Sequence, residues 1–327
     1  MIASKPGTRL TVDPFLELFA GFEERELLGP DRHLLAGLGV PAGIALVVLD
    51  EKAAQTADFH TLAAPTKIFT KEMDAYGFSD YLGVGDIIAH TQGGYLHDGM
   101  IAAAAASWLR GKAADLAKEN KPWFLAVNLV NPHDVMFYDT DKPGKPVQGK
   151  NALAHLAGDP AHAMYAKQWD VKLPVSFSQA IDGPGRPAAH TDLTMGNDAF
   201  TGPIPVEDTW RWRKRHNFYL NALRDVDRHI MTVLDELEDR GMLSNTIVIL
   251  TSDHGELGGA HQLTGKGATS YREQNNVPLI VSHPAYAGGK RCKAVTSHLD
   301  LAPTLVALTN ASPEKKAAIT QALPGKD

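Results

Sequence analysis

The chain has 327 residues, a length that corresponds to one large domain or two domains of ordinary size. Hydrophobic residues make up 44% of the sequence and charged residues 21%, a balance that excludes an intrinsically disordered chain. The formal net charge is −6, from 32 basic and 38 acidic residues. This acidic balance argues against nucleic acid or an anionic membrane as the main partner.

Neither a membrane span nor a secretory signal is predicted. The longest apolar stretch is Ile101–Leu109, whereas a helix that spans a bilayer needs about 20 residues. The charged N-terminal residues are followed by no apolar run of the kind that a signal peptide needs. The single cysteine, Cys292, excludes an intrachain disulfide and a zinc site of four thiolates. We therefore expect a cytoplasmic protein, and the sequence leaves its oligomeric state open.

The N-terminal part of the chain gives the weakest pattern. Residues 1–57 contain a strand-like run at Ile44–Leu49, and the first forty of them carry no chemical motif. The alanine-rich run Ile101–Ala117 then predicts a helix, which Asp98 can cap at its start. The next run, Trp123–Val130, is apolar at all but one position. It predicts a strand buried on both faces, as in a parallel sheet covered by helices.

Further along the chain, helices and strands alternate. Residues 139–205 show little periodicity and predict an irregular excursion over one edge of the sheet. Apolar residues at helical spacing predict a long amphipathic helix over Glu207–Arg240. Two more buried strands are predicted at Thr246–Thr251 and Pro278–Ser282, and a helix at Leu301–Leu308. This alternation predicts a layered α/β domain, with its chemistry at the carboxyl ends of the strands.

Polar residues directly follow two of the predicted strands. The first strand is followed by Asn131-Pro132-His133-Asp134, and the second by Ser252-Asp253-His254-Gly255-Glu256. A glycine-rich loop with His261 and Lys266 comes next. Such an arrangement suits a hard metal ion, because the strand fixes the carboxylate and the glycines let the loop turn tightly around the ion.

Each of these residues also has an ordinary structural interpretation. Asp253 can end a strand in a turn, and His133 can cap a turn. Lys266 lies between two glycines and can be a solvated loop lysine. Three further residues are expected to act as hydrogen-bonding supports: Asp134, Glu256 and His298.

Taken together, four blocks of the sequence resemble the sulfatase family, a branch of the alkaline-phosphatase superfamily. Residues 121–134, KPWFLAVNLVNPHD, resemble the family's segment that contains the active-site histidine. Residues 245–256, NTIVILTSDHGE, resemble its second metal-binding strand, and the loop with His261 and Lys266 resembles its substrate-lysine loop. Residues 297–305, SHLDLAPTL, resemble the helix that follows in the family. These blocks occur in the family's order, and the resemblance covers residues 58–327.

This resemblance implies an α/β/α fold of the alkaline-phosphatase type, with a mixed, largely parallel central sheet. It also implies a metal-dependent hydrolase whose partner is a small-molecule sulfate ester. Asp253 and His254 are expected to bind a divalent cation, Ca²⁺ in the first place, with Mn²⁺ or Zn²⁺ as alternatives. His133 and Lys266 are expected to be catalytic: the histidine contacts the substrate or leaving group, and the lysine holds a sulfate oxygen. His261 is expected to bind substrate beside them.

The chain departs from the family pattern in several places. It contains no Cys-x-Pro-Ser-Arg or Ser-x-Pro-Ser-Arg motif, so no residue is assigned as the nucleophile. Residues 1–50 hold no Asp pair after a buried strand, and only Lys52 remains of the family's Gly-Lys-Trp-His motif. The resemblance implies that members of the family continue into a smaller C-terminal subdomain, which we expect this chain to lack. We therefore expect an incomplete or inactive catalytic core, residues 58–327, after the poorly matching segment 1–57.

Two other interpretations remain open. A phosphodiester or phosphonate monoester hydrolase of the same superfamily shares the Asp-His metal strand. A non-catalytic protein could keep the scaffold as a binding module, which the missing nucleophile and the two alanines after Lys52 favour.

Overall fold

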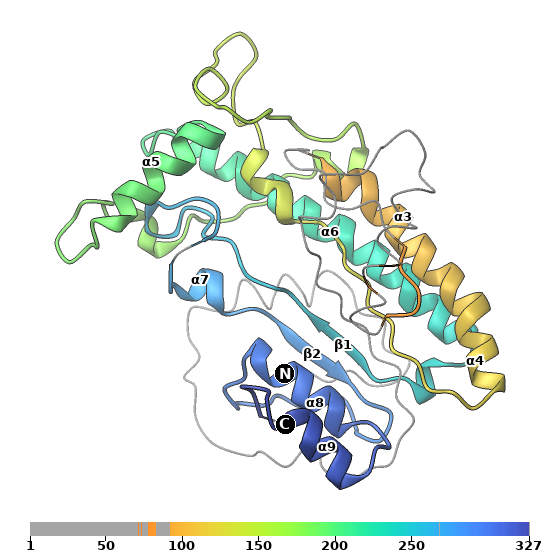
Figure 1. The fold of residues 1–327 in the computed structure, drawn as a ribbon. Coiled ribbons are helices and arrows are strands. Elements are labelled where there is room, and N and C mark those ends of the chain that lie inside the picture. The colour runs from red at the N-terminus through yellow and green to blue at the C-terminus, as the bar shows by residue number, and fades with distance from the viewer. Residues whose placement is uncertain (1–70, 72, 74–77, 83–91, 268, 327) are drawn as a thin grey trace.

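The computed structural model describes residues 71, 73, 78–82, 92–267 and 269–326. Figure 1 shows a pair of long helical rods that run side by side, a short pair of strands next to them, and two small helices beyond the strands. The strand predicted at Ile44–Leu49 and the match at Lys52 lie outside the described residues.

The first helical rod confirms the alanine-rich helix of the sequence. Helix α3, Gly93–Trp108, continues through a π-helical segment, Leu109–Ala113, into α4, Ala114–Lys118. Alanine has the highest helix propensity, and its small side chain lets a neighbouring helix approach closely. The alanines that α3 buries are Ala102, Ala105 and Ala106.

Asp98 does not cap this helix, contrary to the prediction. It lies in the second turn of α3, fully buried, and its carboxylate accepts the N–H groups of Val130 (2.6 Å) and Asn131 (3.0 Å). The helix begins earlier, where a side chain at Gly94 would collide with Asn131. Asp98 therefore anchors the residues that precede His133, a long-range contact that local spacing does not reveal.

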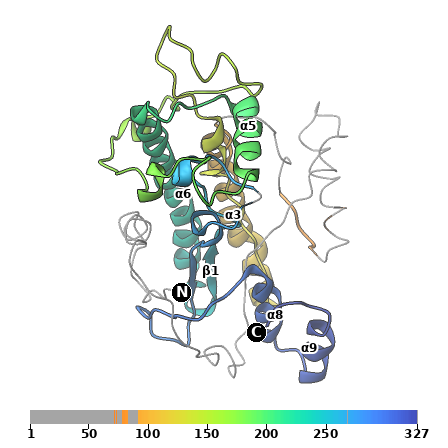
Figure 2. The same cartoon turned by 90° about the vertical axis from the view of Figure 1, so that its left-hand side faces the viewer.

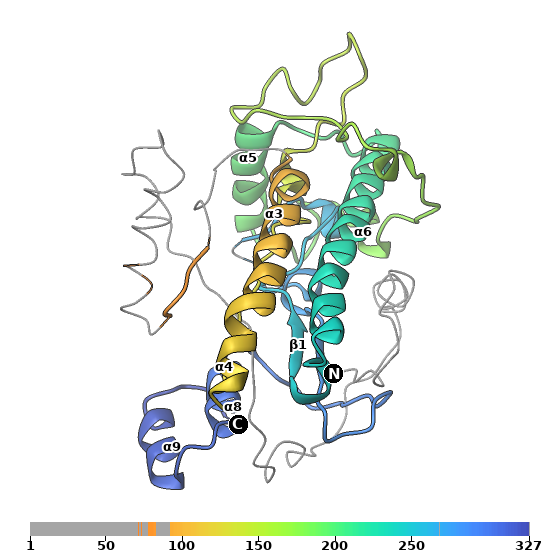
Figure 3. The same ribbon diagram turned by 90° about the vertical axis from the view of Figure 1, so that its right-hand side faces the viewer.

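The second rod is α6, Thr209–Asp239, and it confirms the amphipathic helix predicted over Glu207–Arg240. Gly241 ends it with φ +68°, a left-handed conformation that glycine adopts without strain. Figure 3 shows α6 beside α3 along most of the length of both helices. None of the helices in the described ranges, α6 included, is long and apolar enough to cross a membrane.

Aromatic side chains fill the core between α6 and the excursion. Tyr138 stacks on Phe218 with ring centroids 4.3 Å apart, and Tyr165 packs against the same ring at 5.8 Å. The hydroxyl of Tyr165 donates to the buried Asp225 at 2.9 Å. Each of these rings contributes about 1.5–3 kcal/mol to stability by its burial, and the Tyr165 hydroxyl has its hydrogen-bond partner in the core.

The two downstream strands form where the sequence predicts them but run in opposite directions. Strand β1, Val248–Thr251, pairs antiparallel with β2, Leu279–Ser282, and this is the one sheet within the described ranges. The expected sheet is mixed, and this pair is one of its antiparallel contacts, because the loop 252–278 returns the chain directly beside β1. The pair packs on α8, Leu301–Ala307, which confirms the predicted C-terminal helix; α9, Pro313–Thr320, follows it.

The segment Trp123–Val130 forms no strand in the described structure, contrary to the prediction. Its residues are half-buried or exposed, Phe124 is 37% exposed, and no described strand pairs with it. Its apolar side chains pack against residues of both helical rods, at the place where the two rods meet. Packing and the Asp98 carboxylate, rather than a strand ladder, therefore hold its end in place.

The excursion, residues 139–205, is irregular as predicted, except that it contains helix α5, Ala189–Thr201. Figure 2 shows it gathered at one end of α3 and α6. The buried amide of Gln148 donates to the carbonyls of Tyr138 (3.2 Å) and Thr201 (3.0 Å). Side chains thus satisfy backbone groups that regular elements would otherwise pair.

The buried Asp98 carboxyl predicts a pH effect on stability. Burial raises its pKa to about 7, the two accepted N–H groups oppose the shift, and Asp225 and Asp134 add to it. Because the pKa in the folded chain lies above the unfolded value, this group's contribution to stability is complete below about pH 4 and is lost as the pH rises through about 7.

Between about pH 5 and about pH 8, we expect the unfolding free energy of Asp98→Asn to fall less steeply with rising pH than that of wild type. At the acid end the variant should be less stable by about 1–3 kcal/mol, because an amide cannot accept both N–H groups. Urea unfolding across this range measures both effects. Exposed Asp239→Asn is the matched control, and equal slopes in Asp98→Asn and wild type would contradict the prediction.

Candidate active site

Two loops that are distant in the sequence meet near the end of β1. One carries His133 at the start of a short 3-10 turn, His133–Phe137, and the other carries Lys266. The Lys266 Nζ donates to the carbonyl oxygen of His133 at 3.3 Å. Two residues that the sequence singles out as catalytic are therefore neighbours in space.

The charges around Lys266 tie it to the acidic residues of the same region. Burial lowers the pKa of its ammonium group, the carboxylates of Glu256, Asp253 and Asp134 oppose this shift, and Arg215 adds to it. Charges influence one another in this way only at short range. Lys266, Asp253 and Asp134 therefore share one electrostatic environment.

The orientation of His133 is set by the residue that follows it. Its Nδ1 lies 2.9 Å from Oδ1 of Asp134, which is buried, while the imidazole itself is 44% exposed. A side chain at Gly93, the first residue of α3, would come within 2.6 Å of Asp134 Oδ2. When Nδ1 donates to Asp134, Nε2 remains as the acceptor that a general base needs.

Asp253 and His254 follow β1 and stand at the edge of this region. Asp253 Oδ1 accepts the backbone N–H of His254 at 2.9 Å, and its Oδ2 lies 3.5 Å from His254 Nε2. The Asp253 side chain is 80% exposed, so it is free to take a ligand. His298 lies close by, with its Nε2 2.8 Å from the carbonyl of Ser252.

These two residues supply only part of a metal site. Within the described ranges no three His, Cys, Asp or Glu side chains converge closely enough to hold an ion. Calcium takes six to eight oxygen ligands, and the tetrahedral zinc sites of proteins use three or four protein donors. The described donor set therefore does not complete a site for a divalent cation.

A buried ion pair supports the lysine loop. Glu256 Oε1 accepts the guanidinium of Arg215 at 3.0 Å and the N–H of Gly265, the residue before Lys266, at 2.9 Å. Arg215 projects from α6 and is 1% exposed. Helical spacing could have predicted that Arg215 is buried, because it follows the buried Trp212 by three residues, on the apolar face of α6.

His261 lies in a different cluster from His133. Its ring stacks on Tyr271 with centroids 3.8 Å apart, and its carbonyl accepts from Arg186 at 3.0 Å. Its Nδ1 lies 2.8 Å from Oε1 of Gln179. The prediction pointed to His261 but not to Arg186, because an irregular segment such as 139–205 offers no periodicity from which a contact could be inferred.

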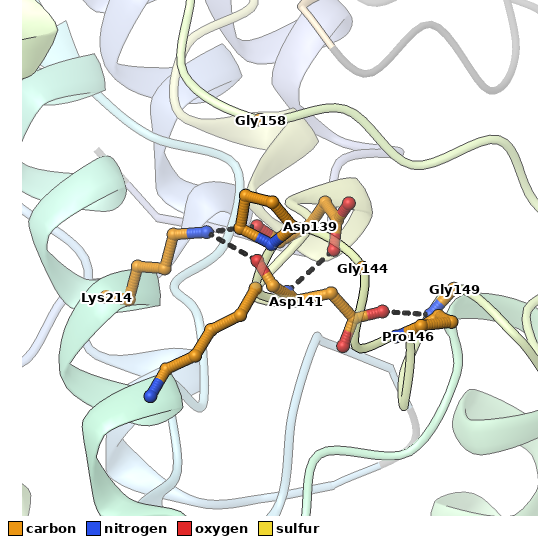
Figure 4. A pocket seen from close by; sticks show the side chains of 9 residues that line it. Asp139, Asp141, Gly144, Pro146, Gly149, Gly158 and Lys214 are labelled. Atoms are coloured by element: carbon orange, nitrogen blue, oxygen red, sulfur yellow. Dashed lines mark hydrogen bonds between the residues drawn. The ribbon is translucent and has the colours of Figure 1, made fainter.

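A cavity of about 560 Å³ lies away from these residues, between the excursion and α6 (Figure 4). Lys214 donates there to the carbonyls of Asp139 (2.9 Å) and Asp141 (3.3 Å). The Asp141 carboxylate is already held by Arg211 and by the N–H of Gly149. No sequence-predicted site residue lines this cavity, and Lys214 and Asp141 in it are engaged by neighbouring protein groups.

The support of the lysine loop predicts a large effect of Arg215→Met on stability. The change leaves the buried Glu256 carboxylate without its cation, which costs about 3–5 kcal/mol of unfolding free energy. The control is Arg213→Met on the same helix, where the side chain is exposed and the expected change is within about 0.5 kcal/mol. If urea unfolding gives the two variants equal stability, the ion pair is not the support described here.

A family model matches this chain over most of its length, and curated proteins match parts of it. The sulfatase family model matches residues 53–311. The uncharacterized sulfatase YidJ of Escherichia coli (strain K12) is 40% identical over 110 residues, which are 33% of this chain and 21% of that protein. An N-acetylglucosamine-6-O-sulfatase of Bacteroides thetaiotaomicron is 34% identical over 99 residues, which are 30% of this chain and 18% of that protein.

Among solved structures, a phosphonate monoester hydrolase of Silicibacter pomeroyi aligns with 75% of this chain and 46% of its own, with a TM-score of 0.43 and 21% identity. The matched parts amount to less than half the length of each of these three proteins. The family model, in contrast, covers well over half of this chain, including the segments of His133, Asp253 and Lys266. The chain therefore belongs to the sulfatase family, whose members have an α/β fold of the alkaline-phosphatase type and generally use a divalent metal.

Proposed function

We propose that this chain binds sulfate monoesters at Lys266 and His133. The observation that carries the proposal is the contact between the Lys266 ammonium and the His133 carbonyl, among the charges of Asp253 and Asp134. A partly buried ammonium attracts an anion more strongly than one in bulk water, because the local dielectric constant is lower. Lys266 would hold a sulfate oxygen, and the imidazole of His133 would face the ester oxygen.

His133 would serve as the proton carrier of the site. Imidazole changes charge near neutral pH, so it can give a proton to a leaving alkoxide or take one from water. The bond from its Nδ1 to Asp134 keeps the ring in one orientation with Nε2 directed elsewhere. This arrangement supports a role in ester cleavage rather than only in binding.

The charge balance favours sulfate monoesters over phosphate monoesters. The charges that act on Lys266 here are the three carboxylates of Glu256, Asp253 and Asp134 and the guanidinium of Arg215. A sulfate monoester carries one negative charge, whereas a phosphate monoester near neutral pH carries up to two and would meet stronger repulsion from these carboxylates. Phosphodiesters and phosphonate monoesters carry one negative charge, as sulfate monoesters do, so they are the second candidate class; the binding experiment below includes a phosphate monoester.

Turnover needs groups beyond those described. Relatives in this family use a formylglycine made from the cysteine, or the serine, of a Cys/Ser-x-Pro-Ser-Arg motif, and the sequence contains neither form. Removing a nucleophile costs orders of magnitude in rate, since the remaining groups only bind and polarise the substrate. We therefore propose that this chain by itself binds sulfate esters and hydrolyses them at or near the background rate.

Asp253 and His254 would contribute ligands to a divalent cation, Ca²⁺ before Mn²⁺ or Zn²⁺. An exposed carboxylate directly after a strand suits a hard cation. Since the described residues supply no third donor, the affinity of this chain for the ion should be weak. The substrate-binding role proposed for Lys266 and His133 does not depend on it.

Calorimetric titration with 4-nitrophenyl sulfate tests the binding proposal. We expect Lys266→Ala to weaken binding at least about tenfold, or about 1.4 kcal/mol, because it removes the ammonium that pairs with the sulfate. Lys290→Ala, an exposed lysine elsewhere on the chain, is the control and should bind as wild type does. Binding to 4-nitrophenyl phosphate should be weaker than to the sulfate.

Equal affinity of Lys266→Ala and wild type for the sulfate ester would overturn the binding proposal. Release of nitrophenol from the same ester, followed by absorbance, tests the second part. Metal-dependent turnover well above background that Lys266→Ala abolishes would show that the chain is catalytically competent, contrary to our expectation.

Calcium should stabilise the chain weakly through Asp253. With a Kd of about 1 mM, a tenfold excess over Kd adds about 1.4 kcal/mol, which raises the melting temperature by a few degrees. Asp253→Asn should lose this shift, and Asp239→Asn should keep it. An unchanged melting temperature at 10 mM calcium, or a shift that survives Asp253→Asn, would rule out the ligand assignment.

A further inference from the structure

A cationic and aromatic cluster forms where the excursion reaches the lysine loop, at the start of α7, Arg272–Asn275 (Figure 1). Arg186 Nη1 donates to the hydroxyl of Tyr271 at 2.6 Å, and its Nη2 donates to the carbonyl of His261 at 3.0 Å. The rings of His261 and Tyr271 stack with an angle of 19° between their planes. All three side chains keep part of their surface exposed. The cluster is thus an ordered platform that solvent can reach.

The positive charge of Arg186 is not neutralised by this cluster. Its hydrogen-bond acceptors are uncharged: a phenol oxygen, an imidazole nitrogen and the backbone carbonyls of Ala180 and His261. No carboxylate of the described residues lies within ion-pair distance of its guanidinium. Within the described structure these acceptors engage its Nε, its Nη1 and one N–H of Nη2, so the charge stays uncompensated and the second N–H of Nη2 remains for a sulfate or carboxylate oxygen.

A second observation points to a ligand at the same place. His190 is 8% exposed, and its Nδ1 is buried without a hydrogen-bond partner in the described structure. Its ring lies 5.4 Å from that of Tyr271. More than nine in ten buried polar groups are hydrogen-bonded in folded proteins, so this open nitrogen, on a ring that lies near that of Tyr271, points to a partner that a bound ligand would supply.

The backbone of this cluster connects it to Lys266. His261 (φ +58°) and Gln262 (φ +61°) adopt left-handed conformations, which are rare for residues other than glycine and occur often at functional sites. Lys266 is five positions after His261, so their Cα atoms lie within about 18 Å of each other. Asn197 of α5 fixes the chain between them by donating to the carbonyl of Thr264 at 2.9 Å.

We propose that Arg186, on the platform of Tyr271 and His261, binds a second anionic group of the substrate. This inference rests on the proposed function, in which Lys266 holds the sulfate ester. It adds a substrate class, namely a sugar that carries another sulfate or a carboxylate besides the sulfate at Lys266. The stacked rings would lie along the sugar, and the guanidinium would pair with the anion.

The experiment compares the affinities of the full chain for two ligands, glucosamine 6-sulfate and glucosamine N,6-disulfate, by calorimetric titration. Wild type should bind the disulfate at least about tenfold more tightly than the monosulfate. Arg186→Gln should reduce this ratio to about one and leave the affinity for the monosulfate within about twofold of wild type. Exposed Arg213→Gln is the matched control and should keep the wild-type ratio.

Further variants separate the inference from a structural role of Arg186. Arg186→Lys keeps the charge but not the planar fork and should give an intermediate ratio. Tyr271→Phe removes one hydrogen-bond partner of Arg186 but keeps the stacked ring, and should retain most of the preference. An unchanged ratio in Arg186→Gln overturns the proposal, as does an equal loss for both ligands with a lowered melting temperature, which indicates only a structural clamp.

Lys266→Ala distinguishes this inference from the proposed function. It should weaken the binding of both ligands by the same factor. If it weakens neither while Arg186→Gln still lowers the ratio, the Arg186 site stands and the role of Lys266 falls. If wild type binds neither ligand, both are overturned.

Discussion

The buried ion pair between Glu256 and Arg215 is the interaction on which the site depends. One carboxylate oxygen of Glu256 accepts hydrogen bonds from the guanidinium of Arg215 on α6 and from the N–H of Gly265. Glu256 therefore connects the residues after β1 to the lysine loop and to α6. Because a buried charge without its partner is costly, Glu256 stays where Arg215 holds it, and its hydrogen bond to the N–H of Gly265 positions the residue before Lys266. The ammonium of Lys266 is therefore presented next to a fixed carboxylate.

Helix α6 supports the irregular part of the chain in the same way. Its polar side chains reach into the excursion, where few backbone groups are paired by regular elements. Asn221 donates to the carbonyls of Tyr165 and Lys167, and Lys214 donates to those of Asp139 and Asp141. A long excursion can thus be ordered without strands, because one helix face satisfies its buried carbonyls.

Lys266 of the lysine loop and Arg186 of the excursion, which contacts this loop, differ in their surroundings. Lys266 lies among carboxylates whose charges oppose the lowering of its pKa by burial, whereas Arg186 is held by neutral acceptors. The lysine loop therefore meets one charge-balanced cation of its own and one uncompensated cation from the excursion. Under the proposal for Arg186, the first binds the sulfate ester and the second a further anionic group of the same substrate.

The sequence by itself determined the family, the long helix α6, both strands and the candidate residues His133, Asp253 and Lys266, because strong periodicity and ordered motifs are local properties of the chain. Only the tertiary structure decided that Asp98 holds Val130 and Asn131 instead of capping a helix, that β1 and β2 are antiparallel, and that Trp123–Val130 forms no described strand. It also brought in Arg215 and Arg186, whose partners lie 41 and 75 residues further along the chain. Such contacts depend on which buried groups find a partner once the chain has folded, and no spacing along the sequence records that.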